Sequence, residues 1–105
     1  MSWAYLFVAG ILEIVWAYTM KQSHGFNRLI PSLITVLAMV VSFWLLAIAM
    51  RTIPLGTAYT IWTGIGAVGA FFVGIVFLAE PISAARIIAV ILIVSGLVLM
   101  KLSIV

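Results

Sequence analysis

One carboxylate lies inside an apolar run of the sequence, "AGILEIVWAYTMK" at residues 9–21, where Glu13 has no basic residue within a helical turn. An ionisable side chain in a membrane span costs about 2.5 kcal/mol or more to insert, so such a residue usually serves a function. Gly10 and Trp16 are three residues before and after Glu13 and share its face of a helix. Glu13 is therefore the primary candidate for a binding residue, with Gly10 and Trp16 beside it.

Two later apolar runs carry further polar and aromatic side chains. Ser42 lies in residues 29–50, and Tyr59 and Trp62 lie in residues 57–79. At 1.5 Å per helical residue, all of them and Glu13 lie within roughly 15 Å of one membrane face, so they could line one cavity. Two alternatives stay open: Ser42 could bond its own helix backbone, and Tyr59 and Trp62 could belong to the interfacial aromatic belt.

A single carboxylate among aromatic side chains is suited to binding a cation. In an apolar environment a carboxyl group favours its neutral form, so it can hold a proton near neutral pH and release it when a cation arrives. Trp and Tyr ring faces also attract cations. The sequence therefore predicts proton–cation exchange at Glu13. It contains no cysteine and its one histidine, His24, lies in a polar loop, so no hydrolytic chemistry, metal site or cofactor is predicted.

The composition indicates an integral membrane protein. Of the 105 residues 68% are hydrophobic and 7% are charged, with a mean hydropathy of +1.46, far from the balance of soluble domains. The net charge of +3 comes from basic residues that are scattered singly, so no nucleic-acid partner is predicted.

Charged and turn-forming stretches divide the chain into four apolar segments, each near the 20 residues that span a bilayer. The predicted fold is all-α, one transmembrane domain over residues 1–105, with short connections that make neighbouring helices antiparallel. The predicted spans are residues 3–20, 29–50, 57–79 and 84–102.

Basic residues are almost evenly divided between the two sides of the predicted membrane domain. One side has Arg51 and Lys101, and the other has Lys21, Arg28 and Arg86. Because an excess of Lys and Arg sets orientation, a difference of one residue barely specifies it. We therefore expect the chain to insert in both orientations.

Four helices of this length enclose little space, so a transport path is expected to need two protomers. Small residues recur every four positions in the third span, at Gly66, Ala70 and Gly74, and this spacing lets helix backbones approach closely. In the fourth span Ala85, Ala89 and Gly96 share a face. Packing inside one protomer and contact between protomers both explain the third-span pattern, whereas a dimer contact is favoured for the fourth.

Five stretches resemble the small multidrug resistance family, and more specifically its guanidinium exporter branch. They are "GILEIVWA" (10–17), "GFNRLIPSLIT" (25–35), "SFWLLA" (42–47), "PLGTAYTIWTGIGAVGA" (54–70) and "LAEP" (78–81). Trp16, one turn after the central Glu, is typical of this branch. The branch that exports bulky quaternary ammonium compounds typically has Gly there.

The resemblance implies an antiparallel, dual-topology homodimer in the bacterial inner membrane that exchanges protons for guanidinium. It implies that Glu13, Trp16, Ser42, Tyr59 and Trp62 surround the substrate. Small substituted guanidinium ions are expected to be accepted as well. Broader export of quaternary ammonium compounds is the alternative within the family.

Three rival classes share part of this pattern: a small dual-topology ion channel, a rotor proteolipid of a proton-driven ATPase and a structural assembly subunit. The rotor proteolipid is usually a two-helix hairpin, and a structural subunit would not need Glu13. Glu80, beside Pro81 at the end of the third span, costs little as a carboxylate and is assigned no transport role.

Overall fold

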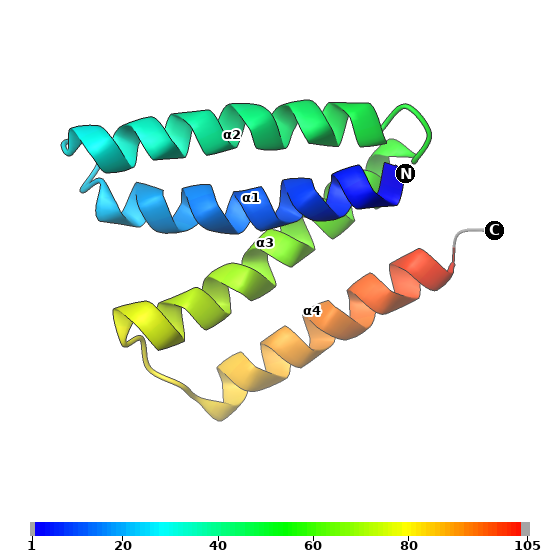
Figure 1. Cartoon of the computed structure of the whole chain (residues 1–105). Coiled ribbons are helices and arrows are strands. Elements are labelled where there is room, and N and C mark those ends of the chain that lie inside the picture. Colours follow the sequence, from blue (N-terminus) through cyan, green and yellow to red (C-terminus); the bar gives the residue numbers. More distant parts are fainter. Residues whose placement is uncertain (1, 104–105) are drawn as a thin grey trace.

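Residues 2–103 are described by a computed structural model, and within that range they form four α-helices and no strand (Figure 1). Each helix is long and apolar enough to cross a membrane, which confirms the predicted all-α protein with four spans. The third helix begins two residues earlier than predicted because Pro54 lies just before it with a φ of −57° that suits a helix start. The helices are α1 (Ser2–Gln22), α2 (Leu29–Ala49), α3 (Leu55–Leu78) and α4 (Ala84–Leu102).

Local hydrogen bonds determine where the helices end. After α1, the Ser23 hydroxyl donates to the carbonyl of Met20 at 2.7 Å and accepts from the N–H of Phe26 at 3.0 Å. In the same turn Gly25 has a φ of +72°, a conformation that glycine adopts without steric cost. Before α4, the Ser83 hydroxyl accepts from the N–H of Arg86 at 3.2 Å, as an N-cap serine does.

The helices pack unequally. α1 packs against both α2 and α3 along its length, whereas among the described helices the backbone of α4 comes close only to that of α3. One side chain joins α4 to α1, since Lys101 Nζ lies 4.3 Å from the ring centroid of Trp3. Figure 1 shows α1 and α2 side by side, α3 crossing beneath α1, and α4 beyond it. The buried core lies at the end where α1 begins and α2 turns into α3. Its members are Leu6, Ala9, Leu46, Ala49, Ile53, Ala58, Ile61 and Trp62.

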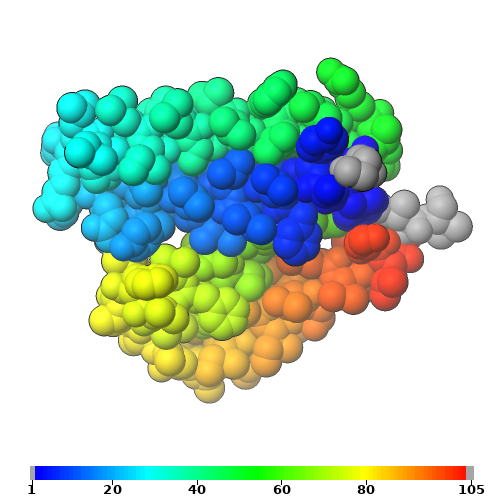
Figure 2. Space-filling model, in the orientation of Figure 1, coloured from blue at the N-terminus to red at the C-terminus, as the bar shows by residue number. Residues whose placement is uncertain are grey.

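The chain has a thin, open shape. Its Cα atoms extend over 44 × 35 × 16 Å, and a helix with its side chains is about 10–12 Å across. No residue of α4 is buried, and the helix forms one edge of the face shown in Figure 2. Many Ile, Leu, Val and Phe side chains are exposed on the surface, as a lipid environment favours.

Candidate functional site

The Glu13 carboxyl lies in the contact between α1 and α3, directly over Gly66. A methyl group added at Gly66 would overlap the carboxyl oxygen and would come within 2.8 Å of Glu13 Cγ. Only glycine leaves this space, so Gly66 is what admits the acid between the two helices. The buried Glu13 Oε1 has no hydrogen-bond partner among the described residues. Such an atom is available to a ligand, because a buried polar group left unpaired is costly.

Ser42 connects three helices at the same site. Its hydroxyl, which is fully buried on α2, donates to the carbonyl of Ala9 on α1 at 2.7 Å. It accepts from the indole Nε1 of Trp62 on α3 at 3.0 Å. Ser42 therefore bonds across helices rather than to its own helix backbone, and it positions Trp62 instead of contacting Glu13.

The aromatic side chains form a continuous row in which Phe43 is the member that sequence reasoning missed. The Phe43 ring centroid lies 6.3 Å from that of Trp16 and 5.6 Å from that of Trp62, with edge-to-face geometry in both pairs. Tyr59 lies beyond, 5.4 Å from Trp62. The only sequence signal for Phe43 was its place directly after Ser42.

Tyr59 and Trp62, the two members of the aromatic row that lie on α3, differ in exposure. Trp62 is 5% exposed and Tyr59 is 51% exposed. Trp62, held by Ser42, is therefore a buried residue rather than part of an interfacial belt. Tyr59 remains at the outer end of the row. Trp16 is partly buried, and its buried Nε1 has no partner among the described residues, like the Glu13 oxygen three residues earlier.

The other small residues predicted for the first and third spans, Gly10, Ala70 and Gly74, each contact a different neighbour. Gly10 packs against Ile65 of α3, where a methyl group would come within 2.9 Å of the Ile65 Cβ. In α3, Gly74 lies against the carboxyl of Glu80, and Ala70 lines the cavity between α1 and α3. The third-span stripe thus faces groups of its own chain.

The fourth-span stripe is largely uncovered. Space beside Gly96 is open, with no heavy atom within 4 Å of an added methyl group. Gly96 and Ala89 line two open grooves between α3 and α4, of about 440 and 430 Å³. Ala85 is exposed.

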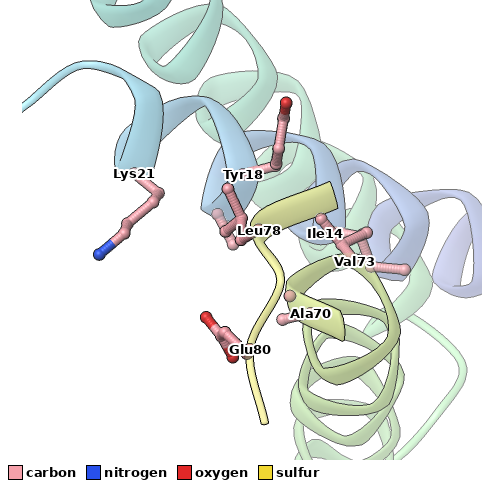
Figure 3. A pocket seen from close by; sticks show the side chains of 9 residues that line it. Ile14, Tyr18, Lys21, Ala70, Val73, Leu78 and Glu80 are labelled. Carbon is pink, nitrogen blue, oxygen red and sulfur yellow. The ribbon is translucent and has the colours of Figure 1, made fainter. Parts of the chain in front are cut away.

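A cavity of about 140 Å³ lies between α1 and α3 (Figure 3). Its α1 residues follow Glu13 in the sequence, whereas the α1 residues of the core, Leu6 and Ala9, precede it. Ile14 and Ala17 of α1 line it beside Ala70 of α3, so it begins next to the Glu13–Gly66 contact. Lys21 and Glu80 line its outer end. Sequence reasoning did not predict that Glu80 would reach a cavity.

Together these features suit the binding of a small cation. The site offers a carboxyl oxygen without a partner, an adjacent indole and a row of aromatic rings. Carboxylates bind planar nitrogen cations through charge-assisted hydrogen bonds, and aromatic faces add cation–π attraction. Within residues 2–103 no cluster of three metal-ligating side chains occurs.

Comparison with known proteins gives a consistent match. Residues 1–93 match the family model described as Small Multidrug Resistance protein. A protein named "Guanidinium exporter" from Salmonella typhimurium strain LT2 is 57% identical over 103 residues, with 98% of each chain covered. Proteins of the same name from Escherichia coli K12 and Klebsiella oxytoca are 56% identical over the same length, with 98% of each chain covered.

Proposed function

Because the chain belongs to the small multidrug resistance family, we propose that it exports guanidinium in exchange for protons, with Glu13 as the shared binding residue. The chain is a multi-pass membrane transporter of the bacterial inner membrane. Its relatives at 56–57% identity over 98% of the chain are named guanidinium exporters, which supports guanidinium as the substrate. The observation that carries the proposal is the unpartnered Glu13 oxygen between α1 and α3.

Exchange follows from competition for one group. A protonated Glu13 has no charge to attract a cation. An ionised Glu13 between two apolar helices needs a bound cation to balance its charge. Proton and guanidinium therefore exclude each other at Glu13. Each crosses the membrane only when the site changes from facing one side of the membrane to facing the other. Coupling requires no second acid in the membrane-spanning part of the chain.

The residues around Glu13 suit a flat, donor-rich ion. Guanidinium presents N–H groups in a fork that matches a carboxylate in bidentate fashion and stacks on aromatic faces. Trp16 is three residues from Glu13, and the Ser42 hydroxyl on α2 holds the Trp62 indole of α3 in place by a hydrogen bond. Tetraalkyl ammonium ions have no hydrogen-bond donors for the carboxylate and need more space. The site between Glu13 and the aromatic rings therefore disfavours them.

The transporting unit is an antiparallel, dual-topology homodimer. One chain, only 16 Å thick between its Cα atoms, does not enclose Glu13 on all sides. The uncovered face of α4, with open space at Gly96, is suited to helix packing against a second copy. The near-equal count of basic residues on the two sides supports insertion in both orientations. A C-terminal reporter fusion found on one side only would contradict this part of the proposal.

Transport in liposomes tests the function. Under an imposed proton gradient the wild-type protein should accumulate guanidinium and leave a tetraalkyl ammonium ion almost untransported. Glu13→Gln should abolish proton-driven accumulation. The matched control is Thr63→Val, because the Thr63 hydroxyl bonds only its own helix, at the carbonyl of Tyr59. Proton-driven flux that survives in Glu13→Gln would rule the assignment out.

A further inference from the structure

Glu80 is the second of the two acidic residues in the sequence, and its carboxyl is folded back against α3. The N–H of Glu80 donates to the carbonyl of Gly74 at 3.1 Å, because Ala79, with a φ of +55°, reverses the chain after α3. A methyl group added at Gly74 would lie 2.5 Å from Glu80 Oε1. Glu80 therefore lines the α1–α3 cavity as well as the groove between α3 and α4.

The group that Glu80 holds in this structure is itself a guanidinium. Arg86 Nη2 lies 3.4 Å from Glu80 Oε1, and Arg86 Nη1 donates to the carbonyl of Pro81 at 2.9 Å. The Arg86 Cζ lies 5.2 Å from the ring centroid of Phe71. A carboxylate, a carbonyl oxygen and an aromatic face thus surround one planar cation, the three kinds of group that recognise guanidinium.

We propose that Glu80, the Pro81 carbonyl and the Phe71 ring form a second guanidinium site, which Arg86 occupies here and which a free guanidinium ion takes by displacing it. The site lies at the mouth of the α1–α3 cavity and collects the ion on its way to or from Glu13. This inference rests on guanidinium being the transported ion.

A line of small residues joins the two acids. Gly74 contacts the Glu80 carboxyl, Gly66 contacts the Glu13 carboxyl, and Ala70 lies midway on the same face of α3. Eight helical residues separate the two glycines, about 12 Å. The 140 Å³ cavity occupies the Glu80 end of this line. Ala70 and Gly74 thus form part of the wall of this cavity, and Gly66 continues the stripe to the Glu13 carboxyl.

The second site binds weakly enough to release its ion. The Arg86 and Glu80 side chains are 38% and 40% exposed, and an ion pair of that exposure changes an equilibrium constant by no more than about fivefold. Arg86 is therefore readily displaced. Lys21 lines the same cavity, and Figure 3 shows it on the same side as Glu80. Its positive charge opposes retention of a cation there, as suits a site of passage rather than storage.

Binding of radiolabelled guanidinium to purified protein tests the inference with the central site disabled. In the Glu13→Gln background, adding Arg86→Gln should raise the affinity for guanidinium by up to about fivefold, because the internal competitor is gone. Arg86→Lys should raise it less while keeping the charge. Adding Glu80→Gln to Glu13→Gln/Arg86→Gln should abolish the binding. Size-exclusion chromatography verifies that each variant is folded.

Binding that is the same with and without Glu80→Gln would overturn the second site, as would an affinity that Arg86→Gln leaves unchanged. In the otherwise wild-type protein, Glu80→Gln should raise the KM for guanidinium transport about fivefold and leave the rate at saturation unchanged. The proposed function fails separately, if the wild-type protein does not accumulate guanidinium under a proton gradient.

Discussion

Replacing Gly66 with alanine should impair transport without unfolding the protein. The added methyl group would overlap the Glu13 carboxyl and come within 2.8 Å of Glu13 Cγ, where ordinary contact begins at 3.4 Å. The overlapping atoms belong to the end of a flexible side chain, so the carboxyl can move while the helices stay in place. We expect it to shift by on the order of 1 Å, since the gap at Cγ must widen by at least 3.4 − 2.8 = 0.6 Å.

The substitution should lower transport without lowering stability. A displacement of about 1 Å of a reacting group can lower a rate on the order of a hundredfold, so proton-driven guanidinium uptake should fall by about tenfold to a hundredfold. Alanine is favoured over glycine inside a helix by about 1 kcal/mol, so the melting temperature in detergent should not fall.

Gly56→Ala is the matched control, because it makes the same substitution in the first turn of the same helix with no heavy atom within 4 Å of the added methyl group. Uptake in liposomes should be normal for this variant. Normal uptake in Gly66→Ala would refute the placement of Glu13 over Gly66. Uptake lost together with the folded state would refute the claim that only the carboxyl moves.

Three further substitutions test the packing around the site by unfolding in detergent. Ser42→Ala should lower the free energy of unfolding by about 1–3 kcal/mol because it leaves the buried indole N–H of Trp62 unpaired; a loss of the same size when Ser42→Ala is made in a Trp62→Phe background, where that N–H is absent, would contradict this reason. Gly69→Ala should separate α1 from α3 because its methyl group would overlap Ile14, and the second change Ile14→Ala should restore stability; an additive loss would show that the two do not touch. Ser83→Ala should lower the free energy of unfolding by about 1 kcal/mol through the lost cap of α4, with Ser83→Asp as the variant that retains it.

The fold was largely predictable because a bilayer permits few solutions. With no charged residue between 29 and 50 or between 57 and 79, both stretches are suited to a bilayer, where only helices can satisfy the backbone of such a span. The start of α3 was placed two residues late because Pro54 and Gly56 read as a turn, although proline also suits the residue before a helix. The unequal packing of α4 was not predictable, since apolar helices carry little information about which neighbour they prefer.

The candidate site could be read from the sequence where a residue type is unusual for its surroundings, and less well where contacts between helices decide which residues meet. Glu13 stands out in an apolar run, but its partner Gly66 was read as part of a packing stripe. The sequence leaves open whether Ser42 lines a cavity with Glu13 or bonds its own helix, and its hydroxyl bonds to Ala9 and Trp62 instead. A cross-helix hydrogen bond of this kind depends on helix rotation, which spacing alone does not give.

The contacts of Phe43 and Glu80 were not predictable from the sequence, for a common reason. Neither residue type is unusual at its position: Phe43 is one of many large apolar residues, and a carboxylate at a helix end is ordinarily solvated. Their contacts come from the neighbours that the fold supplies, two tryptophan rings for Phe43 and the Arg86 guanidinium for Glu80.

Proton release on substrate binding is the most direct test of competition at Glu13. Guanidinium should be titrated into purified protein near neutral pH in two buffers of different ionisation enthalpy, with Glu13→Gln measured in parallel. The wild-type protein should release protons as it binds guanidinium, and Glu13→Gln should release none. Guanidinium binding by the wild type without proton release would mean that the carboxyl does not exchange one ion for the other.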